Sequence, residues 1–246
     1  MNDAIHIERL TKQFNGKTVL NKVNMTVKKG EIYAFLGANG AGKTTLMKLL
    51  FGILIPDEGR ISILGQPVGN NRDNSVFQKI GNIIETPVFY NHLNAIDNLL
   101  IHCNYMGKQF IPNIPDTLEL VGLTDLGDKK AGEFSLGMKQ RLAMARALIT
   151  NPSLLVLDEP INGMDPMGIQ DTRNLLLKIN QEQGTAILIS SHIISELAKM
   201  ANMVGIIDHG VMLAQRPTAE IFNELKNEKI ELEDYFRQVV CEKAFA

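Results

Sequence analysis

Three short stretches of the chain are apolar at consecutive positions, and each is followed at once by glycine or polar residues. They are Ile32–Leu36 before Gly37, Leu154–Leu157 before Asp158, and Ala186–Ile189 before Ser190. Continuous apolar runs of this length are typical of strands that are buried on both faces of a parallel sheet. Ligands of open parallel sheets bind beyond the carboxyl ends of the strands. The pattern therefore predicts one shared site at these three strand ends.

The first thirty residues have a different pattern, in which apolar and polar positions alternate. Residues 4–10 and 18–27 each fit a short strand of this kind, and the second closes at a turn, Lys28-Lys29-Gly30. Alternation with a period of two is typical of strands with one solvated face. We therefore expect an antiparallel β subdomain at the edge of the fold.

Two other segments favour helices. Residues 86–150 have helical spacing, with Ile96 and Leu99 on one candidate apolar face, and residues 217–246 begin with a helix-like segment. The predicted fold class is α/β, a mostly parallel sheet with flanking helices, into which 86–150 is inserted as a helical subdomain. Residues 217–246 are expected to form a peripheral C-terminal helix, and 1–246 a single domain.

The composition of the chain excludes several classes of protein. The 246 residues are 45% hydrophobic and 21% charged, with 20 Gly and 9 Pro, which excludes a disordered or collagen-like chain. A formal charge of −2 offers no general basic field for nucleic acid or an anionic membrane. Cys103 and Cys241 lie far apart in the sequence, so we expect neither a zinc site nor a disulfide framework. This cysteine usage indicates a protein of the reducing cytosol. Since no apolar run approaches the ~20 residues that span a bilayer, we expect another chain to provide any membrane anchor.

The glycines after the first apolar run belong to a phosphate-binding motif. Residues 37–44, Gly-Ala-Asn-Gly-Ala-Gly-Lys-Thr, fit G-x-x-x-x-G-K-[ST] between a buried strand and an amphipathic segment. Backbone amides and a helix N-terminus bind phosphate there, while Lys43 reaches the β- and γ-phosphates and the Thr44 hydroxyl is placed for Mg²⁺. The residues expected to bind ATP are Gly37, Ala38, Asn39, Gly40, Ala41, Gly42, Lys43, Thr44 and Thr45. The motif predicts a P-loop NTPase core. A dinucleotide-binding loop is disfavoured, because Lys43 and its neighbours stand where the third glycine is needed.

Acidic residues at the end of the second apolar run complete this predicted site. Asp158 is expected to hold Mg²⁺, and Glu159 to orient and deprotonate the water that attacks the γ-phosphate. Without the phosphate loop, such residues would be ordinary solvated strand ends. His192 follows the third run and is expected to contact the γ-phosphate or the attacking water, with a structural role as the alternative.

Residues 134–148 resemble the signature and the following helix of the nucleotide-binding subunits of ATP-binding cassette (ABC) transporters. Their sequence is Phe-Ser-Leu-Gly-Met-Lys-Gln-Arg-Leu-Ala-Met-Ala-Arg-Ala-Leu, and the resemblance covers nearly the whole chain. Ser135 can cap that helix, and Gly137 admits a phosphate close to the backbone. The signature residues are Ser135, Leu136, Gly137 and Met138. The segment also has the pattern of an ordinary amphipathic helix, so only these residues are assigned a function.

The resemblance implies a partner subunit. In this family the signature of one subunit closes over the nucleotide in the phosphate loop of another, and one chain here holds one loop and one signature. A head-to-tail dimer with a second copy or a similar subunit follows. The resemblance also assigns the coupling of the two sites to Asp165. It assigns the stacking of an aromatic ring on adenine to Phe14, for which core packing is the alternative.

One position departs from the family pattern. At the entry to the helical insertion the family has a glutamine that contacts Mg²⁺ and senses the γ-phosphate, and this chain has Glu85. A carboxylate can still bind Mg²⁺ and relay to the membrane subunit, but it adds negative charge beside Asp158 and Glu159. In the signature, Leu136 replaces a glycine and Met138 a glutamine, which changes the hydrogen bonds there.

Glu85 and the form of the signature resemble the branch that exports peptide antibiotics, particularly the self-protection ATPases of lantibiotic producers, and also bacitracin-type and other drug exporters. The resemblance implies an ATP hydrolase that uses ATP and Mg²⁺ on the cytoplasmic face of a bacterial membrane to drive export through separate permease subunits. A soluble ABC protein acting on ribosomes or DNA is one alternative, disfavoured by the single cassette and the charge balance. A small-molecule P-loop kinase is a second alternative, but a kinase would have no role for the signature residues.

Overall fold

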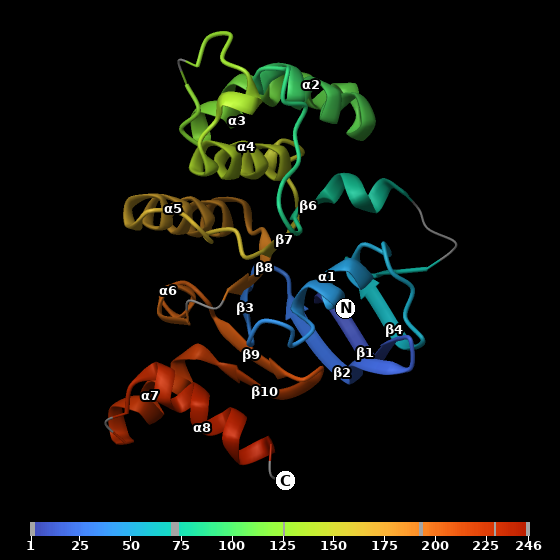
Figure 1. The fold of residues 1–246 in the computed structure, drawn as a ribbon, viewed down its shortest axis with the longest axis vertical. Helices are drawn as coiled ribbons and strands as arrows, with labels where there is room; N and C mark the ends of the chain where they lie inside the picture. The colour runs from blue at the N-terminus through green and yellow to red at the C-terminus, as the bar shows by residue number, and fades with distance from the viewer. Residues whose placement is uncertain (1–2, 70–73, 125, 192–193, 229, 245–246) are drawn as a thin grey trace.

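The computed structural model describes residues 3–69, 74–124, 126–191, 194–228 and 230–244, and a six-stranded sheet runs through its centre (Figure 1). The strand order is β10-β9-β3-β8-β7-β6, with β10 antiparallel to β9 and the other neighbours parallel. The strands are β3 (Ile32–Leu36), β6 (Ile80–Ile83), β7 (Leu154–Asp158), β8 (Ala186–Ser191), β9 (Met203–Asp208) and β10 (Val211–Pro217). Every residue of β3, β7 and β8 is buried, as expected for central strands covered on both faces.

The carboxyl ends of β3, β8 and β7 lie side by side. Leu36 at the end of β3 pairs with Ser191, and Asp158 at the end of β7 pairs with Ser190. The three apolar runs therefore do end at one edge of the sheet, which confirms the predicted convergence of these strand ends.

A second, antiparallel sheet has the strand order β2-β1-β4-β5. Its strands are β1 (Asp3–Phe14), β2 (Lys17–Lys28), β4 (Glu58–Ile63) and β5 (Gln66–Pro67). The antiparallel pair was predicted, but both strands are longer than expected, because β1 continues to Phe14 through register shifts that interrupt its alternation. The buried face of this sheet packs with helix α1 (Lys43–Leu50) in one core cluster that includes Ile5, Leu20 and Leu46.

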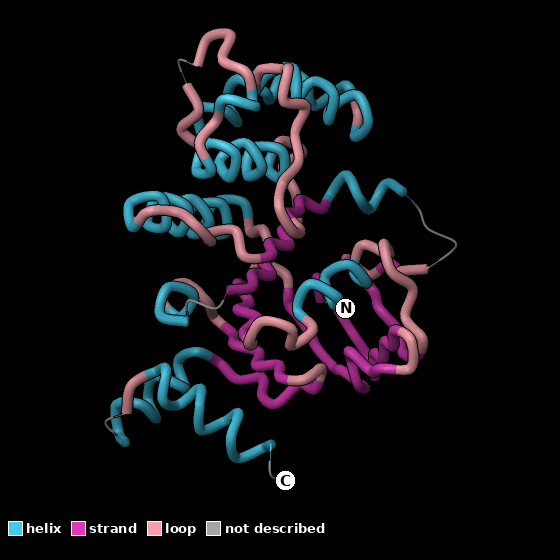
Figure 2. The backbone as a smooth tube through the Cα atoms, in the orientation of Figure 1, coloured by secondary structure: helices cyan, strands magenta, loops and turns pink. Residues whose placement is uncertain are grey.

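The segment 86–150 is helical, as the tube in Figure 2 shows. It holds α2 (Ala95–Met106), η2 (Lys108–Asn113), α3 (Ile114–Leu120), η3 (Ala131–Glu133) and α4 (Leu136–Leu148), and η1 (Asn74–Lys79) comes before β6. Leu99 of α2 and Leu142 of α4 are fully buried in a second core cluster. Ile96 was placed on the same apolar face but is 49% exposed, because the buried face of α2 runs through Ala95, Asn98 and Leu99.

The remaining helices are α5 (Pro166–Gln183), α6 (Ile194–Ala198), α7 (Thr218–Glu228) and α8 (Leu232–Ala244). The prediction of one helix over 217–246 was wrong, since this segment forms both α7 and α8. Ile221 of α7 and Phe236 of α8 are buried in the same core cluster. Both residues line one small cavity, whereas in one straight helix they would lie about 22 Å apart, so the chain turns between them.

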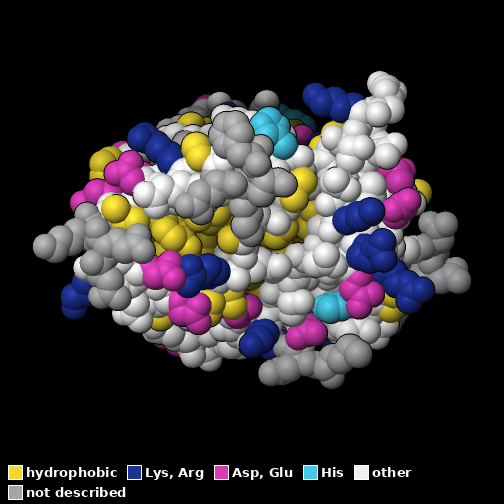
Figure 3. Space-filling model, turned by 90° about the horizontal axis from the view of Figure 1, so that it is seen from below, with side chains coloured by type: hydrophobic (Ala, Val, Ile, Leu, Met, Phe, Trp, Pro, Cys, Tyr) yellow, Lys and Arg dark blue, Asp and Glu magenta, His cyan; other side chains and the backbone are white. Residues whose placement is uncertain are grey.

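Seen from below, on the side of α7 and α8, hydrophobic side chains gather near the middle of the surface, among charges of both signs (Figure 3). In the part of the chain that the structure describes, no helix is long and apolar enough to cross a membrane.

Candidate nucleotide site

The phosphate loop joins β3 to α1, and its glycines are required by the backbone. A Cβ on Gly37 would lie 2.4 Å from the carbonyl oxygen of Ile207, so no side chain fits there. Gly42 precedes α1 with a φ of 109°, a conformation that residues with side chains rarely adopt. The loop thus lies close against β9 and enters α1 abruptly, which leaves the first amides of the helix available to an anion.

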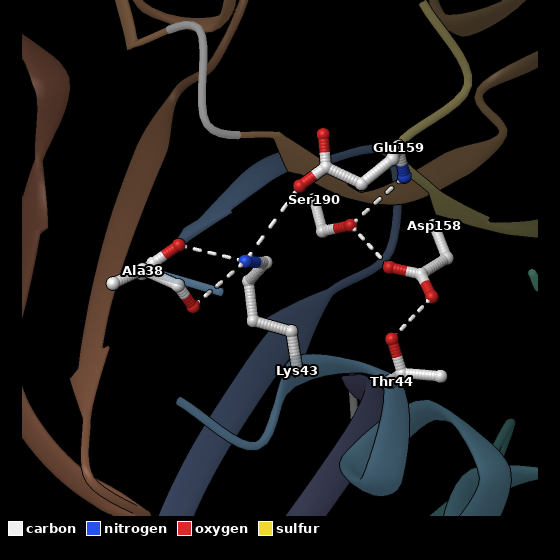
Figure 4. Close-up of polar contacts among 7 residues, drawn as sticks. Ala38, Lys43, Thr44, Asp158, Glu159 and Ser190 are labelled. Atoms are coloured by element: carbon white, nitrogen blue, oxygen red, sulfur yellow. Dashed lines mark hydrogen bonds and ion pairs between the residues drawn. The ribbon is translucent and has the colours of Figure 1, made fainter. Parts of the chain in front are cut away.

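The ammonium group of Lys43 lies inside this loop. Its Nζ donates to the carbonyl oxygens of Gly37 at 2.7 Å and Ala38 at 3.3 Å, and lies 3.6 Å from Oε1 of Glu159 (Figure 4). Lys43 is only 5% exposed. A buried cation that is held by weak carbonyl ligands of its own loop is well placed to bind phosphate oxygens.

A chain of hydrogen bonds joins Thr44 to the two predicted acids. The Thr44 hydroxyl donates to Oδ2 of Asp158 at 2.6 Å, and the Ser190 hydroxyl donates to Oδ1 of Asp158 at 2.7 Å. Ser190 Oγ also accepts from the backbone N–H of Glu159 at 3.0 Å (Figure 4). Lys43, Thr44, Asp158, Glu159 and Ser190, from three separate segments of the chain, therefore meet at one point.

Ser190 is the residue of this cluster to which the sequence assigned no role. It is fully buried, and its hydroxyl bonds both acids: it donates to the Asp158 carboxylate and accepts from the backbone N–H of Glu159. The sequence feature that could have identified Ser190 is its position in the polar end of a buried strand. The pairing of Ser190 with Asp158 depends on β8 lying next to β7, which the sequence does not reveal.

Glu159 has a φ of +49°, in the left-handed region that side chains other than glycine rarely occupy. The backbone turns sharply here, directly after β7 and before Pro160. This turn aims the Glu159 carboxylate toward Lys43, as the ion pair between them records. Strained backbone of this kind concentrates at functional sites.

Glu85 lies in a loop after β6, also with a positive φ, of +60°. Its carboxylate forms an ion pair with Nζ of Lys48 on α1 at 2.5 Å, and its side chain is 59% exposed. The structure thus pairs Glu85 with α1, the helix that begins at the phosphate loop, and Lys48 is a partner that sequence reasoning missed.

The signature residues lie at the start of α4. Ser135 is the N-cap of this helix, since its side chain accepts from the N–H of Met138 at 3.2 Å, which confirms its predicted capping role. Leu136 is 51% exposed, and a Cβ on Gly137 would meet no atom within 4 Å, so the backbone at this position is open. Figure 1 places α4 well apart from α1, so one chain does not bring its own signature to its own phosphate loop.

Two further predicted residues lie at the surface. Asp165 is the N-cap of α5, accepting from the N–H of Gly168 at 2.7 Å. Phe14 at the end of β1 is 41% exposed, so it is not a core residue, and Nζ of Lys12 lies 5.3 Å from the centre of its ring. His192 lies outside the described residues, and its predicted contact with the nucleotide stays a prediction.

Known proteins resemble this chain over most of its length. The ABC transporter family matches residues 20–162. The bacitracin transport ATP-binding protein BcrA of Enterococcus faecalis is 42% identical over 223 residues, which are 90% of this chain and 71% of that protein. The lantibiotic transport ATP-binding protein SrtF of Streptococcus pyogenes is 41% identical over 228 residues, 92% of this chain and 97% of that protein. Both come from the branch that Glu85 and the signature suggested.

Solved structures agree with the fold class. The ATP-binding subunit of an ABC transporter superimposes with a TM-score of 0.85 at 26% identity, covering 96% of this chain and 99% of that one. A nucleotide-free ATP-binding cassette of an ABC transporter superimposes with a TM-score of 0.79 at 27% identity, covering 93% and 97%. The chain therefore belongs to the ABC transporter family, as one of its ATP-binding and ATP-hydrolysing subunits.

Proposed function

We propose that this subunit hydrolyses ATP to drive the export of a peptide antibiotic through a separate membrane permease, and so protects the cell from that peptide. The ATPase part rests on one observation, the meeting of Lys43, Thr44, Asp158 and Glu159 at the end of the central strands. The names of the relatives, bacitracin transport and lantibiotic transport proteins, support the choice of cargo.

Each residue of the cluster has a task in hydrolysis. Lys43 exchanges the carbonyl oxygens of Gly37 and Ala38 for oxygens of the β- and γ-phosphates. The Glu159 carboxylate accepts a proton from the attacking water, and the hydrogen bond from its N–H to Ser190 fixes its backbone. His192 contacts the γ-phosphate or holds the attacking water.

Magnesium fits the oxygen atoms at this point. Asp158 and Thr44 supply a buried carboxylate and a hydroxyl that already touch each other. Among the described residues no group of three or more His, Cys, Asp and Glu could hold a metal ion by itself. An ion bound to Asp158 and Thr44 would take its other ligands from the nucleotide phosphates and water. Bound there, Mg²⁺ would neutralise charge on the phosphates. Glu85, whose Oε1 is paired with Lys48, is the third residue that we expect to contact the ion.

Two subunits form the working unit. The open backbone at Gly137 and the distance of α4 from α1 in one chain support closure of residues 135–138 over the nucleotide of a partner. Asp165 couples the two sites from the start of α5. Glu85 passes the closure to the permease, which holds the subunit at the cytoplasmic face of the membrane.

A Glu159→Gln variant tests the proposal, with Glu182→Gln on the exposed surface of α5 as the matched control. The first variant should lose nearly all ATPase activity and form a stable dimer with ATP, whereas the control should behave as the original chain. Purified from solubilised membranes with ATP, the Glu159→Gln protein should bring a polytopic membrane protein, and cells that lack the subunit should become sensitive to a peptide antibiotic.

Full ATPase activity of Glu159→Gln would overturn the role of Glu159. Recovery of ribosomes or DNA without a membrane protein would overturn the transport function while leaving the ATPase assignment standing. Phosphate transfer to a small-molecule acceptor would instead favour a kinase.

A further inference from the structure

Two neighbouring strand ends are tied to the same face of α1. Thr44 bonds Asp158 at the end of β7 at 2.6 Å, and Lys48, one turn further along α1, is paired at 2.5 Å with Glu85 in the loop after β6. Residues four positions apart in a helix lie on one face, so these two contacts run side by side. We propose that Lys48 positions the Glu85 carboxylate and balances its charge beside the nucleotide, which allows this chain to use a glutamate where the family has a glutamine.

The register of the sheet places Glu85 level with Glu159. Ile83 of β6 pairs with Leu157 of β7 in a parallel ladder, and each glutamate comes two residues after its member of this pair. Both glutamates have a positive φ, +60° at Glu85 and +49° at Glu159. Because neighbouring strands lie about 4.8 Å apart, the backbone at Glu85 leaves the sheet next to the proposed catalytic base.

The carboxylates at this edge of the sheet face two ammonium groups. Nζ of Lys43 lies 3.6 Å from Oε1 of Glu159. Nζ of Lys48 is paired with Glu85, whereas Asp158 accepts bonds from neutral hydroxyls. The triphosphate of ATP brings further negative charge, and like charges at short range repel. A glutamine at position 85 would be neutral, so Glu85 adds one negative charge to the site and Lys48 offsets it.

A carboxylate can contact two cations where an amide cannot. Lys48 donates to Oε1 of Glu85, and the carboxylate has a second oxygen that can contact Mg²⁺ at the same time. The amide of a glutamine has one oxygen, and its NH₂ group is a donor that binds neither an ammonium nor a metal ion. Lys48 and Glu85 therefore match as a pair, and Lys48 should lose its role when residue 85 is glutamine.

Folding stability does not account for this pair. The side chain of Glu85 is 59% exposed and that of Lys48 27%. Ion pairs exposed to this degree add little to stability, because water screens them and both side chains lose freedom. Variants of Lys48 should therefore fold as the original chain does. The role of Lys48 rests on the proposed function, since only a nucleotide at the phosphate loop makes the charge of Glu85 unfavourable.

Equilibrium binding of mant-AMPPNP, a fluorescent ATP analogue that resists hydrolysis, tests the proposal in EDTA and in excess Mg²⁺. Lys48→Met removes the ammonium group and keeps the length of the side chain. In EDTA it should weaken binding about three- to tenfold, because the charge of Glu85 is then unbalanced. In Mg²⁺ the loss should shrink to about twofold or less, since the metal ion supplies positive charge. Lys48→Arg should bind as the original chain does, and so should the control Lys178→Met, on the exposed surface of α5.

A double-mutant cycle shows whether Lys48 acts through Glu85. In a Glu85→Gln background, Lys48→Met should change the affinity in EDTA by less than about twofold. Equal weakening in both backgrounds would mean that Lys48 attracts ATP by itself, and equal weakening with and without Mg²⁺ would mean a general structural loss. Either result, or unchanged binding by Lys48→Met in EDTA, would overturn the proposal and leave hydrolysis by Glu159 untouched. Failure of the original chain to bind the analogue would overturn the proposed ATPase function as well.

Discussion

The hydroxyl of Thr44 and the carboxylate of Asp158 are joined by a 2.6 Å hydrogen bond across 114 positions of sequence. One belongs to the first turn of α1 and the other to the last position of β7. The bond brings together a hydroxyl and a carboxylate oxygen that we expect to be ligands of Mg²⁺. Preorganised ligands of this kind lose little freedom when a cation binds.

Replacing Thr44 by valine keeps the size of the side chain and removes its hydroxyl. We expect the Mg²⁺ concentration for half-maximal ATPase activity to rise at least about tenfold, because one oxygen ligand is lost and Asp158 loses one of its two hydroxyl donors. Thr44→Ser should stay near the original value. The measurement is ATPase activity against Mg²⁺ at saturating ATP, and an unchanged midpoint in Thr44→Val would show that Thr44 is not a ligand.

Replacing Ser190 by alanine should affect both stability and turnover. The change leaves one carboxylate oxygen of Asp158 and the N–H of Glu159 without their shared partner, so the free energy of unfolding should fall by about 1–3 kcal/mol. We expect kcat to fall about tenfold, because both acids lose their positioning. Urea unfolding and steady-state ATPase assays measure the two effects. Ser153→Ala, at an exposed position just before β7, should change neither.

Two substitutions of Ser135 separate its capping role from its role at the partner subunit. Ser135→Ala should lower the free energy of unfolding by about 1 kcal/mol through loss of the cap of α4. Ser135→Asp preserves the cap but places a negative charge where the partner's phosphates are expected, so stability should be kept while ATP-dependent dimer formation is lost. Intact dimer formation in Ser135→Asp, measured by light scattering, would contradict the role of this segment at the nucleotide.

The stability of the protein should fall in mildly acidic solution because of His102. Burial, and then the charge of Arg146, lower the pKa of His102 from 6.5 to about 4. The unfolded chain therefore binds more protons than the folded chain between these values, and the contribution to stability that is present above pH 6.5 is lost as the pH falls toward 4. The slope from this group is at most about 1.4 kcal/mol per pH unit.

Urea unfolding between pH 5 and 7 checks this expectation. A His102→Gln variant should have a flatter dependence on pH than the original protein. His209→Gln, whose side chain is 94% exposed, should leave the dependence as it was. Parallel curves for His102→Gln and the original chain would show that His102 does not set the slope.

The sequence predicted the centre of this protein better than its periphery. Continuous apolar runs identify β3, β7 and β8 because a strand covered on both faces tolerates no polar residue in its middle. The residues that follow two of these runs include Lys43, Asp158 and Glu159, which is why the sequence could predict them as site residues. The motif places Thr44 one residue after Lys43, so its hydroxyl was predictable as well.

The contacts that tertiary structure creates could not be predicted. Asn98 shows why: it lies on the buried face of α2, where its side chain accepts from the N–H of Tyr90 and donates to the carbonyl oxygens of Tyr90 and Asn94. These partners lie only four to eight residues before Asn98, yet a polar residue that is satisfied by the folded loop before its helix looks like an exposed one in the sequence. The Glu85–Lys48 ion pair is hidden for the same reason, since it joins two elements whose distance depends on the whole sheet.

The place of β3 in the sheet has a mechanical consequence. This strand is bonded to β8 on one side and to β9 on the other, and the phosphate loop leaves it directly. Moving the loop would require both sets of hydrogen bonds, to β8 and to β9, to shift at once. By contrast, β6 leads into the helical insertion and lies at the edge of the sheet, where it is bonded to β7 alone among the described strands. We therefore expect the phosphate loop to stay in place when the nucleotide binds. The movement that follows binding should occur at β6 and in the helices after it.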